Sequence, residues 1–522
     1  MIDEHDDDEA APASRTLPRE ATSRRTEHAM EGWLFMAFGA GVQGILSVAV
    51  LLVLARLLSP AEFGTVSAAL LVINFSLVFA QAGVGPAIVQ HPDLRTEHIR
   101  SAFALSLYGG LVLLALLLGF ARPLASMLTA DGVVPVLQVL AWLLPVQGVT
   151  IVAESLLRRD LEFAALARAK SISFVVGYAT VGISVALAGG GLWALAAAHA
   201  AQVVTYSVLV VRRRPHARGV LLDRLATREL LSFGGGFTLA RLGNSLALYG
   251  DKLVVVRWLG PGALGVYERA YQLMAMPATA IGQVLDEVLF PAMAQVQSDT
   301  ARLARAYRRC IAGIALLTLP LSMVVMILAP EIVDLLLGAQ WTMAVGPLRV
   351  LALGTMLRTS YKISDSLARA LGAVYKRAWR QWVYAALAVG GGIIGQQWGI
   401  VGVAAGVLVA LLTNYILMAQ LSLRLIDMPW GEFLAAHGAG IRTSAFLAPL
   451  VWLVAHTGRA VLDLPSALTL ILSLGAAGMG CVLLYVVSPA LLLGEDSQWL
   501  LDRLGRVVSN RLRRFRRAPH PA

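Results

Sequence analysis

Charged residues are scarce in this sequence. Asp, Glu, Lys and Arg together make up 14% of its 522 residues, whereas 57% are hydrophobic. A globule of this size needs a polar surface to stay in water, and this composition cannot supply one. A water-soluble globular protein is therefore excluded, and we expect an all-α integral membrane protein whose solvent is largely lipid.

Cysteine is almost absent. Cys310 and Cys481 lie far apart, inside or beside apolar runs, so neither a disulfide framework nor the ligand spacing of a zinc site can be read from them. The sequence also lacks the phosphate-binding loop GxxxxGK[ST], which argues against direct use of ATP. We expect no metal and no cofactor.

A cleavable signal peptide is also missing from the first residues, which carry an acidic run from Asp3 to Glu9. Residues 1–30 are expected to be a disordered cytosolic tail. The formal charge of +11 could suggest nucleic acid. The Lys and Arg residues, however, occur in short clusters between apolar runs, which is typical of a membrane protein.

Apolar runs of membrane-spanning length are abundant. A helix needs about 20 apolar residues to cross the hydrocarbon, and about fourteen candidates meet this criterion. They begin near Trp33, Thr65, Ile99, Val133, Ser171, Leu192, Phe233, Val266, Cys310, Val345, Trp382, Gly399, Ile441 and Ala467.

The loops between these spans alternate in charge. Basic residues gather in every second loop, within 95–100, 158–170, 212–228, 302–309, 369–380 and 424–442. The intervening loops offer only Arg56, Arg122, Arg257 and Arg459. Because cytoplasmic loops carry the excess of Lys and Arg, we expect a multi-pass protein with both termini in the cytoplasm.

The last residues form a separate basic segment. Within 495–522, apolar residues recur at helical spacing with arginines between them: Leu500, Leu504, Val508, Leu512 and Phe515. This pattern predicts a cytosolic amphipathic helix on the anionic inner leaflet.

The chain repeats itself. RLLSPAEFG at Arg56–Gly64 matches RWLGPGALG at Arg257–Gly265, and ESLLR at Glu154–Arg158 matches DSLAR at Asp365–Arg369. Six spans per repeat is an even number, so the halves should be related by a pseudo-two-fold axis along the membrane normal. We expect six-helix bundles over 31–225 and 226–427, followed by two additional helices within 428–494.

Two like bundles that face a central cleft favour transport by alternating access. The alternative class is a membrane-embedded glycan polymerase or glycosyltransferase. Such an enzyme should carry a sizeable outer loop with carboxylates, because sugar chemistry needs a positioned acid or base. The longest predicted outer loop runs only from about Pro330 to Ala344. The sequence therefore argues against an enzyme.

Several stretches between Gly32 and Leu425 are similar to a known family. They are ARLLSPAEFG, AQAGVGPAIVQ, DKLVVVRWLGPGALGVYERAYQL, VLFPAMAQVQ, LAPEIVDLLLG and WGIVGVA. Together they resemble the Wzx-type polysaccharide transporters, and among them the WzxC-like ones. These lipid-linked oligosaccharide flippases belong to the superfamily that also holds multidrug extruders and the lipid II flippase.

The resemblance implies a function. The substrate would be an oligosaccharide on undecaprenyl pyrophosphate, moved across the bacterial inner membrane for exopolysaccharide, capsule or O-antigen synthesis. Membrane lipids, a glycan polymerase and a chain-length regulator are the implied partners of a monomeric transporter. A multidrug extruder and a lipid II flippase are the alternatives within the superfamily.

Ionisable residues inside spans are costly and hence candidates for function. In the tenth span, Arg358, Lys362 and Asp365 share one helix face, and in the seventh Arg241 lies on a polar face. Arg suits a pyrophosphate through its fork geometry and Lys as a point charge. We therefore predict that Arg241, Arg358 and Lys362 bind the anionic headgroup.

Other charged residues are secondary candidates. Asp251 and Lys252, near the outer end of the seventh span, are candidates for a gate or for coupling, and a local ion pair is the alternative that we favour. The repeat-matched Arg56 and Arg257 are expected at an outer gate.

Glu154 and Asp365 could couple transport to protons. Each precedes an arginine by four residues, Arg158 and Arg369 respectively, so a salt bridge within a helix is the alternative that we favour.

Overall fold

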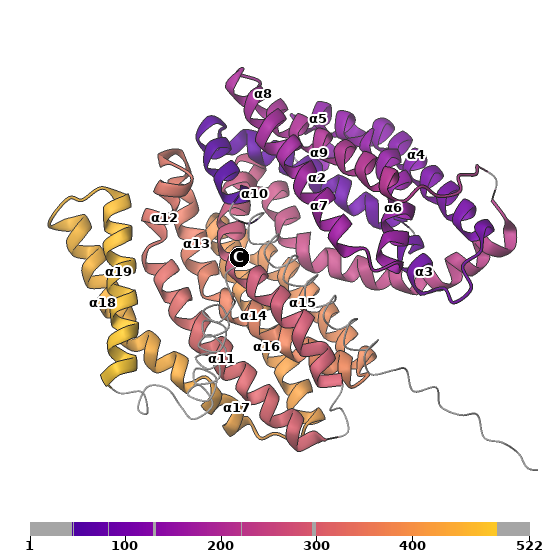
Figure 1. Ribbon diagram of the computed structural model, residues 1–522. Coiled ribbons are helices and arrows are strands. Elements are labelled where there is room, and N and C mark those ends of the chain that lie inside the picture. Colours follow the sequence, from indigo (N-terminus) through magenta and orange to yellow (C-terminus); the bar gives the residue numbers. More distant parts are fainter. Residues whose placement is uncertain are drawn as a thin grey trace, which may run out of the picture.

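The computed structural model describes residues 44, 46–81, 83–128, 132–220, 222–294 and 299–487, without the side chains of 80, 81, 233–242, 244, 280–292, 294 and 374. Every regular element in these ranges is helical (Figure 1). Nine of the described segments are long and apolar enough to cross a membrane. An all-α integral membrane protein is thus confirmed, while the number of about fourteen helices stays a prediction.

The first group of helices follows a short apolar helix, Leu46–Leu57. Most of these helices lie together on one side of the molecule in Figure 1. They are α2 (Pro60–Gln81), α3 (Val84–Gln90), α4 (Thr96–Met127), α5 (Val133–Ala141), α6 (Leu143–Arg159), α7 (Phe163–Phe174), the π-helix η1 (Val175–Gly182), α8 (Ile183–Leu187) and α9 (Leu192–Arg213).

The second group begins with α10 (Arg224–Ala294), which contacts helices of both groups. The others are α11 (Thr300–Ile327), α12 (Ala329–Leu336), the 3₁₀-helix η2 (Ala339–Ala344), α13 (Val345–Ala352), α14 (Gly354–Ala370), α15 (Val374–Gly395), the 3₁₀-helix η3 (Gln396–Trp398), α16 (Gly399–Leu425), α17 (Trp430–Ala436), α18 (Gly438–Ala460) and α19 (Ser466–Val487).

Helix α10 folds back on itself. Gly260 interrupts it with φ 86° and ψ 173°, a conformation that glycine adopts without steric cost. Pro261 follows and cannot donate a backbone hydrogen bond. Residues sixteen positions apart, such as Asp251 and Tyr267, touch across this turn, whereas a straight helix would separate them by about 24 Å. The predicted seventh and eighth spans therefore form a hairpin.

The two matched repeat segments meet at this turn. A side-chain carbon added at Gly64 would lie 1.6 Å from the carbonyl oxygen of Pro261, and one at Gly265 would lie 2.0 Å from that of Pro60. Small residues let helix backbones approach this closely within a membrane. The glycines common to both repeats are thus required where α2 packs against the second segment of α10.

We call the end of the bundle with the 58–60 and 260–261 turns the sealed end, and the opposite end, with the 91–95, 160–162 and 371–373 loops, the arginine-rich end. At the sealed end, Trp341 Nε1 donates to the carbonyl of Ala55 at 2.8 Å. Gln340 donates to the same carbonyl at 2.5 Å and to that of Leu58 at 3.2 Å. Residues from the second group thereby satisfy the free carbonyls at the end of Leu46–Leu57.

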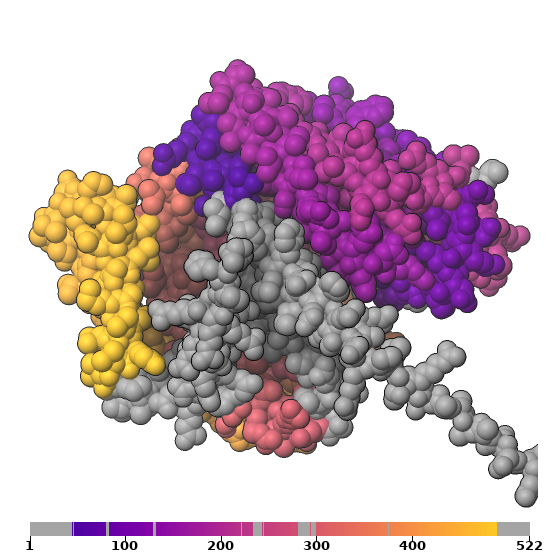
Figure 2. Space-filling model, viewed as in Figure 1, coloured from indigo at the N-terminus to yellow at the C-terminus, as the bar shows by residue number. Residues whose placement is uncertain are grey.

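Helices α18 and α19 lie at one edge of the molecule, as the yellow region of Figure 2 shows. They pack against α11 and α12. Arg459 on α18 forms an ion pair with the buried Glu331 on α12 and donates to the carbonyl of Ile327 at 2.8 Å. A paired internal charge thus joins the two additional helices to the second group.

Some predicted segments lie outside the described residues. These are the tail 1–30, the beginning of the first predicted span at Trp33 and the amphipathic tail 495–522.

Candidate functional site

The hairpin of α10 holds a cluster of charged and phenolic side chains inside the bundle. Asp251 is only 3% exposed and accepts a hydrogen bond from the hydroxyl of Tyr267 at 2.7 Å. Lys252 forms an ion pair with Glu268 at 2.9 Å. Each contact joins the segment before Gly260 to the segment after it. Buried charges are stable when they are paired in this way, so the cluster fixes the two arms of the hairpin together.

Arg358 reaches this cluster from α14. Its guanidinium donates to the hydroxyl of Tyr271 and lies 5.2 Å from the centroid of the same ring. The ammonium of Lys252 lies at the same distance from that ring, so one aromatic face attracts two cations. Among the described residues, no carboxylate lies within ion-pair distance of Arg358. The buried carboxylate of Asp251 interacts with Arg358 electrostatically without forming a salt bridge, so no direct ion pair occupies the guanidinium.

Arg269 is a second internal arginine that forms no direct ion pair with a described residue. It lies on α10, one residue after Glu268, and its guanidinium is 4.7 Å from the centroid of the Phe63 ring on α2. It donates one hydrogen bond, at 2.6 Å, to the side chain of Gln272. In the described part of the chain no carboxylate lies within ion-pair distance of it. Glu268, which is ion-paired with Lys252, interacts with it at longer range.

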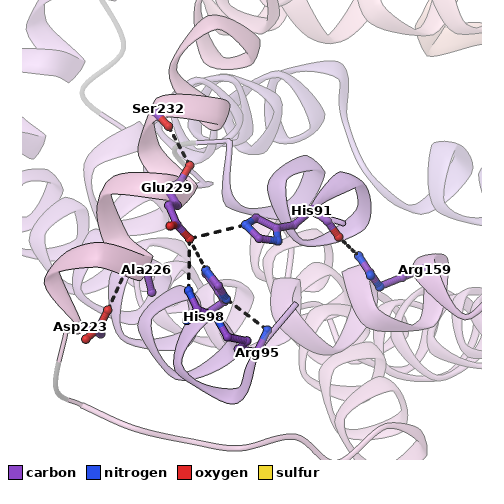
Figure 3. Close-up of polar contacts among 8 residues, drawn as sticks. All are labelled: His91, Arg95, His98, Arg159, Asp223, Ala226, Glu229 and Ser232. Carbon is purple, nitrogen blue, oxygen red and sulfur yellow. Dashed lines mark hydrogen bonds and ion pairs between the residues drawn. The ribbon is translucent and has the colours of Figure 1, made fainter. Parts of the chain in front are cut away.

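A separate polar cluster lies at the arginine-rich end (Figure 3). Glu229, in the first turns of α10, receives a hydrogen bond from His98 Nε2 at 2.6 Å, and His91 Nε2 and the guanidinium of Arg95 each lie 3.7 Å away. The hydrogen bond from the fully buried His98 is the main reason why the pKa of Glu229 lies below its ordinary value. The cluster ties α10 to the loop between α3 and α4.

Two histidines and a carboxylate could in principle hold a metal ion, and their ligand atoms lie within 4.8 Å of one another. The hydrogen bonds do not fit one. Nδ1 of His98 accepts the backbone N–H of Arg95 at 3.1 Å, so the ring proton is on Nε2. A histidine that binds a metal through Nε2 carries its proton on Nδ1. The nearby cation of Arg95 would also repel a metal ion.

Comparison with known proteins decides the family. The family model described as "Polysaccharide biosynthesis protein" matches residues 53–346, more than half of the chain. The chain belongs to this family. The matched residues include the Gly64–Gly265 contact, the charged hairpin of α10 and the sealed end up to α13.

Three relatives of this family member are informative. It is 32% identical over 311 residues to the succinoglycan biosynthesis transport protein ExoT of Rhizobium meliloti, 24% over 304 to the teichuronic acid biosynthesis protein TuaB of Bacillus subtilis, and 23% over 375 to the lipopolysaccharide biosynthesis protein WzxC of Escherichia coli. These matches cover 59%, 57% and 70% of the chain. They span 62% of ExoT and of TuaB and 75% of WzxC.

Solved structures share the fold. The lipid II flippase MurJ in an inward closed conformation superposes with a TM-score of 0.72 at 13% identity, over 87% of this chain and 99% of MurJ. An inward-facing multidrug transporter of the MATE family gives 0.58 at 17% identity, over 74% and 95% of the respective chains. The family model and the relatives confirm the predicted resemblance to the Wzx-type polysaccharide transporters, and these two structures show that the fold is shared.

The structure describes the side chains of two of the three predicted headgroup residues. Arg358 and Lys362 lie one turn apart on α14, both partly exposed, and Lys362 has polar contacts of its own. Arg241 lies on α10, and its side chain is outside the described part. That these three residues bind one anion together stays a prediction.

The predicted partnership between Asp251 and Lys252 is wrong. Lys252 forms its ion pair with Glu268, and Asp251 bonds to Tyr267 instead. Adjacent residues on a helix point about 100° apart and do not face each other. Their partners come from the other arm of the hairpin.

The two repeat-matched helix salt bridges are both present. Arg158 bonds to Glu154 at 2.5 Å, and Arg369 lies 3.2 Å from Asp365. Asp365 is also bonded by Arg377 of α15, so it does not neutralise Arg358. A role of either carboxylate in proton coupling stays untested.

The two matched arginines at the sealed end differ. Arg56 donates to the carbonyl of Leu335 at 3.1 Å and so reaches from Leu46–Leu57 to α12. The guanidinium of Arg257 lies 5.6 Å from the ring of its neighbour Trp258. Contact between the two groups of helices is therefore seen for Arg56, and the gating roles of both remain predictions.

Sequence reasoning missed Arg269 and Glu268. Both lie in the predicted eighth span, within YERAYQL at Tyr267–Leu273. Ionisable residues within spans are candidates for function, and this rule identified Arg358. Applied to the eighth span, it would have identified both residues.

Proposed function

We propose that this protein is a flippase that moves an oligosaccharide linked to undecaprenyl pyrophosphate from the inner to the outer leaflet of the bacterial inner membrane. Both termini would lie in the cytoplasm, and the arginine-rich end would face the same side of the membrane. The product would serve exopolysaccharide, capsule or O-antigen synthesis, and a glycan polymerase and a chain-length regulator would act with the monomeric transporter. Family membership and the names of ExoT and WzxC support this proposal.

Arg358 is the observation that carries the proposal. A cation inside the bundle is costly unless something neutralises it. Among the described residues, Arg358 is held by a phenol and an aromatic ring and forms no salt bridge with a carboxylate, although the buried Asp251 interacts with it at longer range. A pyrophosphate would supply a direct ion pair, because a guanidinium binds phosphate oxygens through two parallel hydrogen bonds. Lys362, one turn along α14, and Arg241, on α10, would complete the headgroup site.

Movement of the substrate would follow alternating access between bundles over 31–225 and 226–427, with α18 and α19 as additions. The contacts of Trp341 and Gln340 with Ala55 hold the two groups together at the sealed end. In the proposed cycle these contacts break while the arginine-rich end closes, as two packed bundles rock about a fixed site.

The charge of the bundle also bears on the alternatives. A multidrug extruder that carries cations should have an acidic or apolar cleft. Here the described cluster around Tyr271 sets two cations, Lys252 and Arg358, beside two carboxylates, Asp251 and Glu268, so it is neither acidic nor apolar. A lipid II flippase would share the pyrophosphate site and differ in the glycan that it accepts.

The test is translocation by the purified protein in liposomes. Undecaprenyl pyrophosphate carrying an oligosaccharide, lipid II and a cationic dye would be offered separately, with protein-free liposomes as the control. Movement of the oligosaccharide lipid in preference to the other two is the expected result. Movement of the dye alone would refute the proposal. Preference for lipid II would identify the protein as a lipid II flippase instead.

A further inference from the structure

A cavity of about 310 Å³ lies beside Arg269. Its walls come from Leu46–Leu57, α2, the α7–η1 segment, α9 and the second arm of α10. This volume is at the lower end of the range for small-molecule sites. The cavity is distinct from the surroundings of Arg358, which is not among its lining residues.

The lining combines aromatic faces with hydrogen-bonding groups. Phe63, Phe174 and Tyr178 provide the rings, and Gln202, Gln272 and Ser67 provide amides and a hydroxyl. The ring of Tyr178 stacks on that of Phe174, with centroids 5.4 Å apart. Sugars present both apolar C–H faces and hydroxyl groups, and aromatic rings with a few convergent polar groups suit such a ligand.

The π-helix η1 helps to shape this wall. A side-chain carbon at Gly177 would lie 2.6 Å from the carbonyl oxygen of Ala198, so η1 packs closely on α9. Tyr178 and Gln202 therefore come from adjacent elements of one wall. Segments of π-helix occur frequently at functional sites, because the wider turn redirects side chains.

Arg269 gives the cavity its charge. A guanidinium has five N–H donors. Arg269 uses one hydrogen bond, to Gln272, and its Nε is buried without a partner. Its other contact is the ring of Phe63. Within the described residues no carboxylate lies within ion-pair distance of it, and Glu268, which interacts with it at longer range, is already paired with Lys252. A buried cation with so few partners is costly, and a ligand anion would relieve this cost.

We infer that this cavity binds a sugar unit of the transported glycan that carries a carboxylate, with Arg269 as the residue that recognises the acid. This inference rests on the proposed flippase function and names the class of glycan. Arg269 lies about 13 Å along α10 from the Gly260 turn. Tyr271, which bonds to Arg358, follows two residues later, so the sugar and the pyrophosphate would bind at similar depths in the bundle.

Binding to the full-length protein in lipid nanodiscs tests the inference. Two probes are needed: undecaprenyl pyrophosphate carrying an oligosaccharide with one uronic acid, and the same lipid with that carboxyl group reduced to an alcohol. Wild-type protein should bind the acidic probe about tenfold or more tightly than the neutral one, as expected for a hydrogen bond to a charged group.

The variants separate the two sites. Arg269→Gln should abolish the preference for the acidic probe and leave the affinity for the neutral probe unchanged. Arg269→Lys, which keeps the charge, should retain part of the preference and shows that position 269 tolerates substitution. Arg358→Ala should weaken the binding of both probes by a similar factor.

Other outcomes would overturn the inference. Equal binding of the two probes by the wild type would show that the protein does not recognise the carboxyl group of the sugar. Equal loss of both probes in Arg269→Gln would reassign Arg269 to the pyrophosphate or to a structural role. Failure of the wild type to bind either probe would instead contradict the proposed function itself.

Discussion

Individual charged residues inside the bundle were only partly predictable. Arg358 stands out in the sequence because a cation near the middle of a span is rare. Its partner Tyr271 could not be predicted, because the two residues are far apart in the sequence and meet only when α14 packs on the α10 hairpin. The same limit explains the error at Lys252, whose partner Glu268 is brought close by the turn at Gly260.

The pair between Lys252 and Glu268 should stabilise the fold. Glu268→Gln would remove the direct ion-pair partner of the buried Lys252, and the free energy of unfolding in detergent should fall by about 3–5 kcal/mol. The double variant Lys252→Met/Glu268→Gln should recover most of this loss. Glu162→Gln is the matched control, because it removes an exposed pair with Arg213 and should cost about 1 kcal/mol or less. An equally small effect of Glu268→Gln would show that the hairpin pair does not stabilise the fold.

The cluster at Glu229 predicts a dependence of stability on pH. The pKa of Glu229 in the folded protein lies below the ordinary value of 4.5. Its stabilising effect is therefore complete above about pH 4.5 and is lost as the pH falls through the lower folded pKa. The unfolding temperatures of the wild type and Glu229→Gln should differ at pH 6 and converge below pH 4.5. A difference that stays constant down to pH 3 would contradict this interpretation.

At the scale of whole elements, sequence periodicity performed well. The predicted starts at Val133, Leu192 and Gly399 coincide with the starts of α5, α9 and α16. The segment from Val345 is less regular than predicted, because it divides into α13 and α14. Apolar runs of sufficient length identify spans. They do not specify which helices pack together, since that depends on small residues such as Gly64 and Gly265.

Substitution of Gly64 should open the sealed end. In Gly64→Leu, the new side chain would overlap the carbonyl of Pro261, which forces α2 and α10 apart. A cysteine placed at the fully buried Ala55 should then react with a membrane-impermeant thiol reagent much faster than in the parent. Gly119→Leu on α4 is the control, because nothing lies within 4 Å of a side chain there. Equal labelling in the two variants would contradict the proposed role of the glycine contact.

At the scale of the whole molecule, the internal repeat identifies two similar segments that the structure brings into contact. The segments Arg56–Gly64 and Arg257–Gly265 are similar in sequence, and their glycines contact the opposite repeat. The seal itself is asymmetric, because Gln340 and Trp341 of the second group cap Leu46–Leu57 and Arg56 reaches α12. Alignment of the repeats could not reveal these contacts, since an alignment shows which segments are similar and not which segments touch.

The central claim is that an internal arginine without a carboxylate partner binds the pyrophosphate during translocation. The most direct test measures the rate at which inverted membrane vesicles translocate a labelled undecaprenyl-pyrophosphate oligosaccharide, at equal protein abundance. Arg358→Ala should lower the rate about tenfold or more, because it removes a hydrogen-bonded charge. Arg358→Lys should be intermediate, since lysine keeps the charge without the fork.

Arg349→Ala is the matched control, because Arg349 is an exposed arginine on the neighbouring α13. This variant should transport at the wild-type rate, whereas Arg358→Ala should not. Wild-type rates in both variants would contradict the claim and reduce Arg358 to a structural partner of Tyr271.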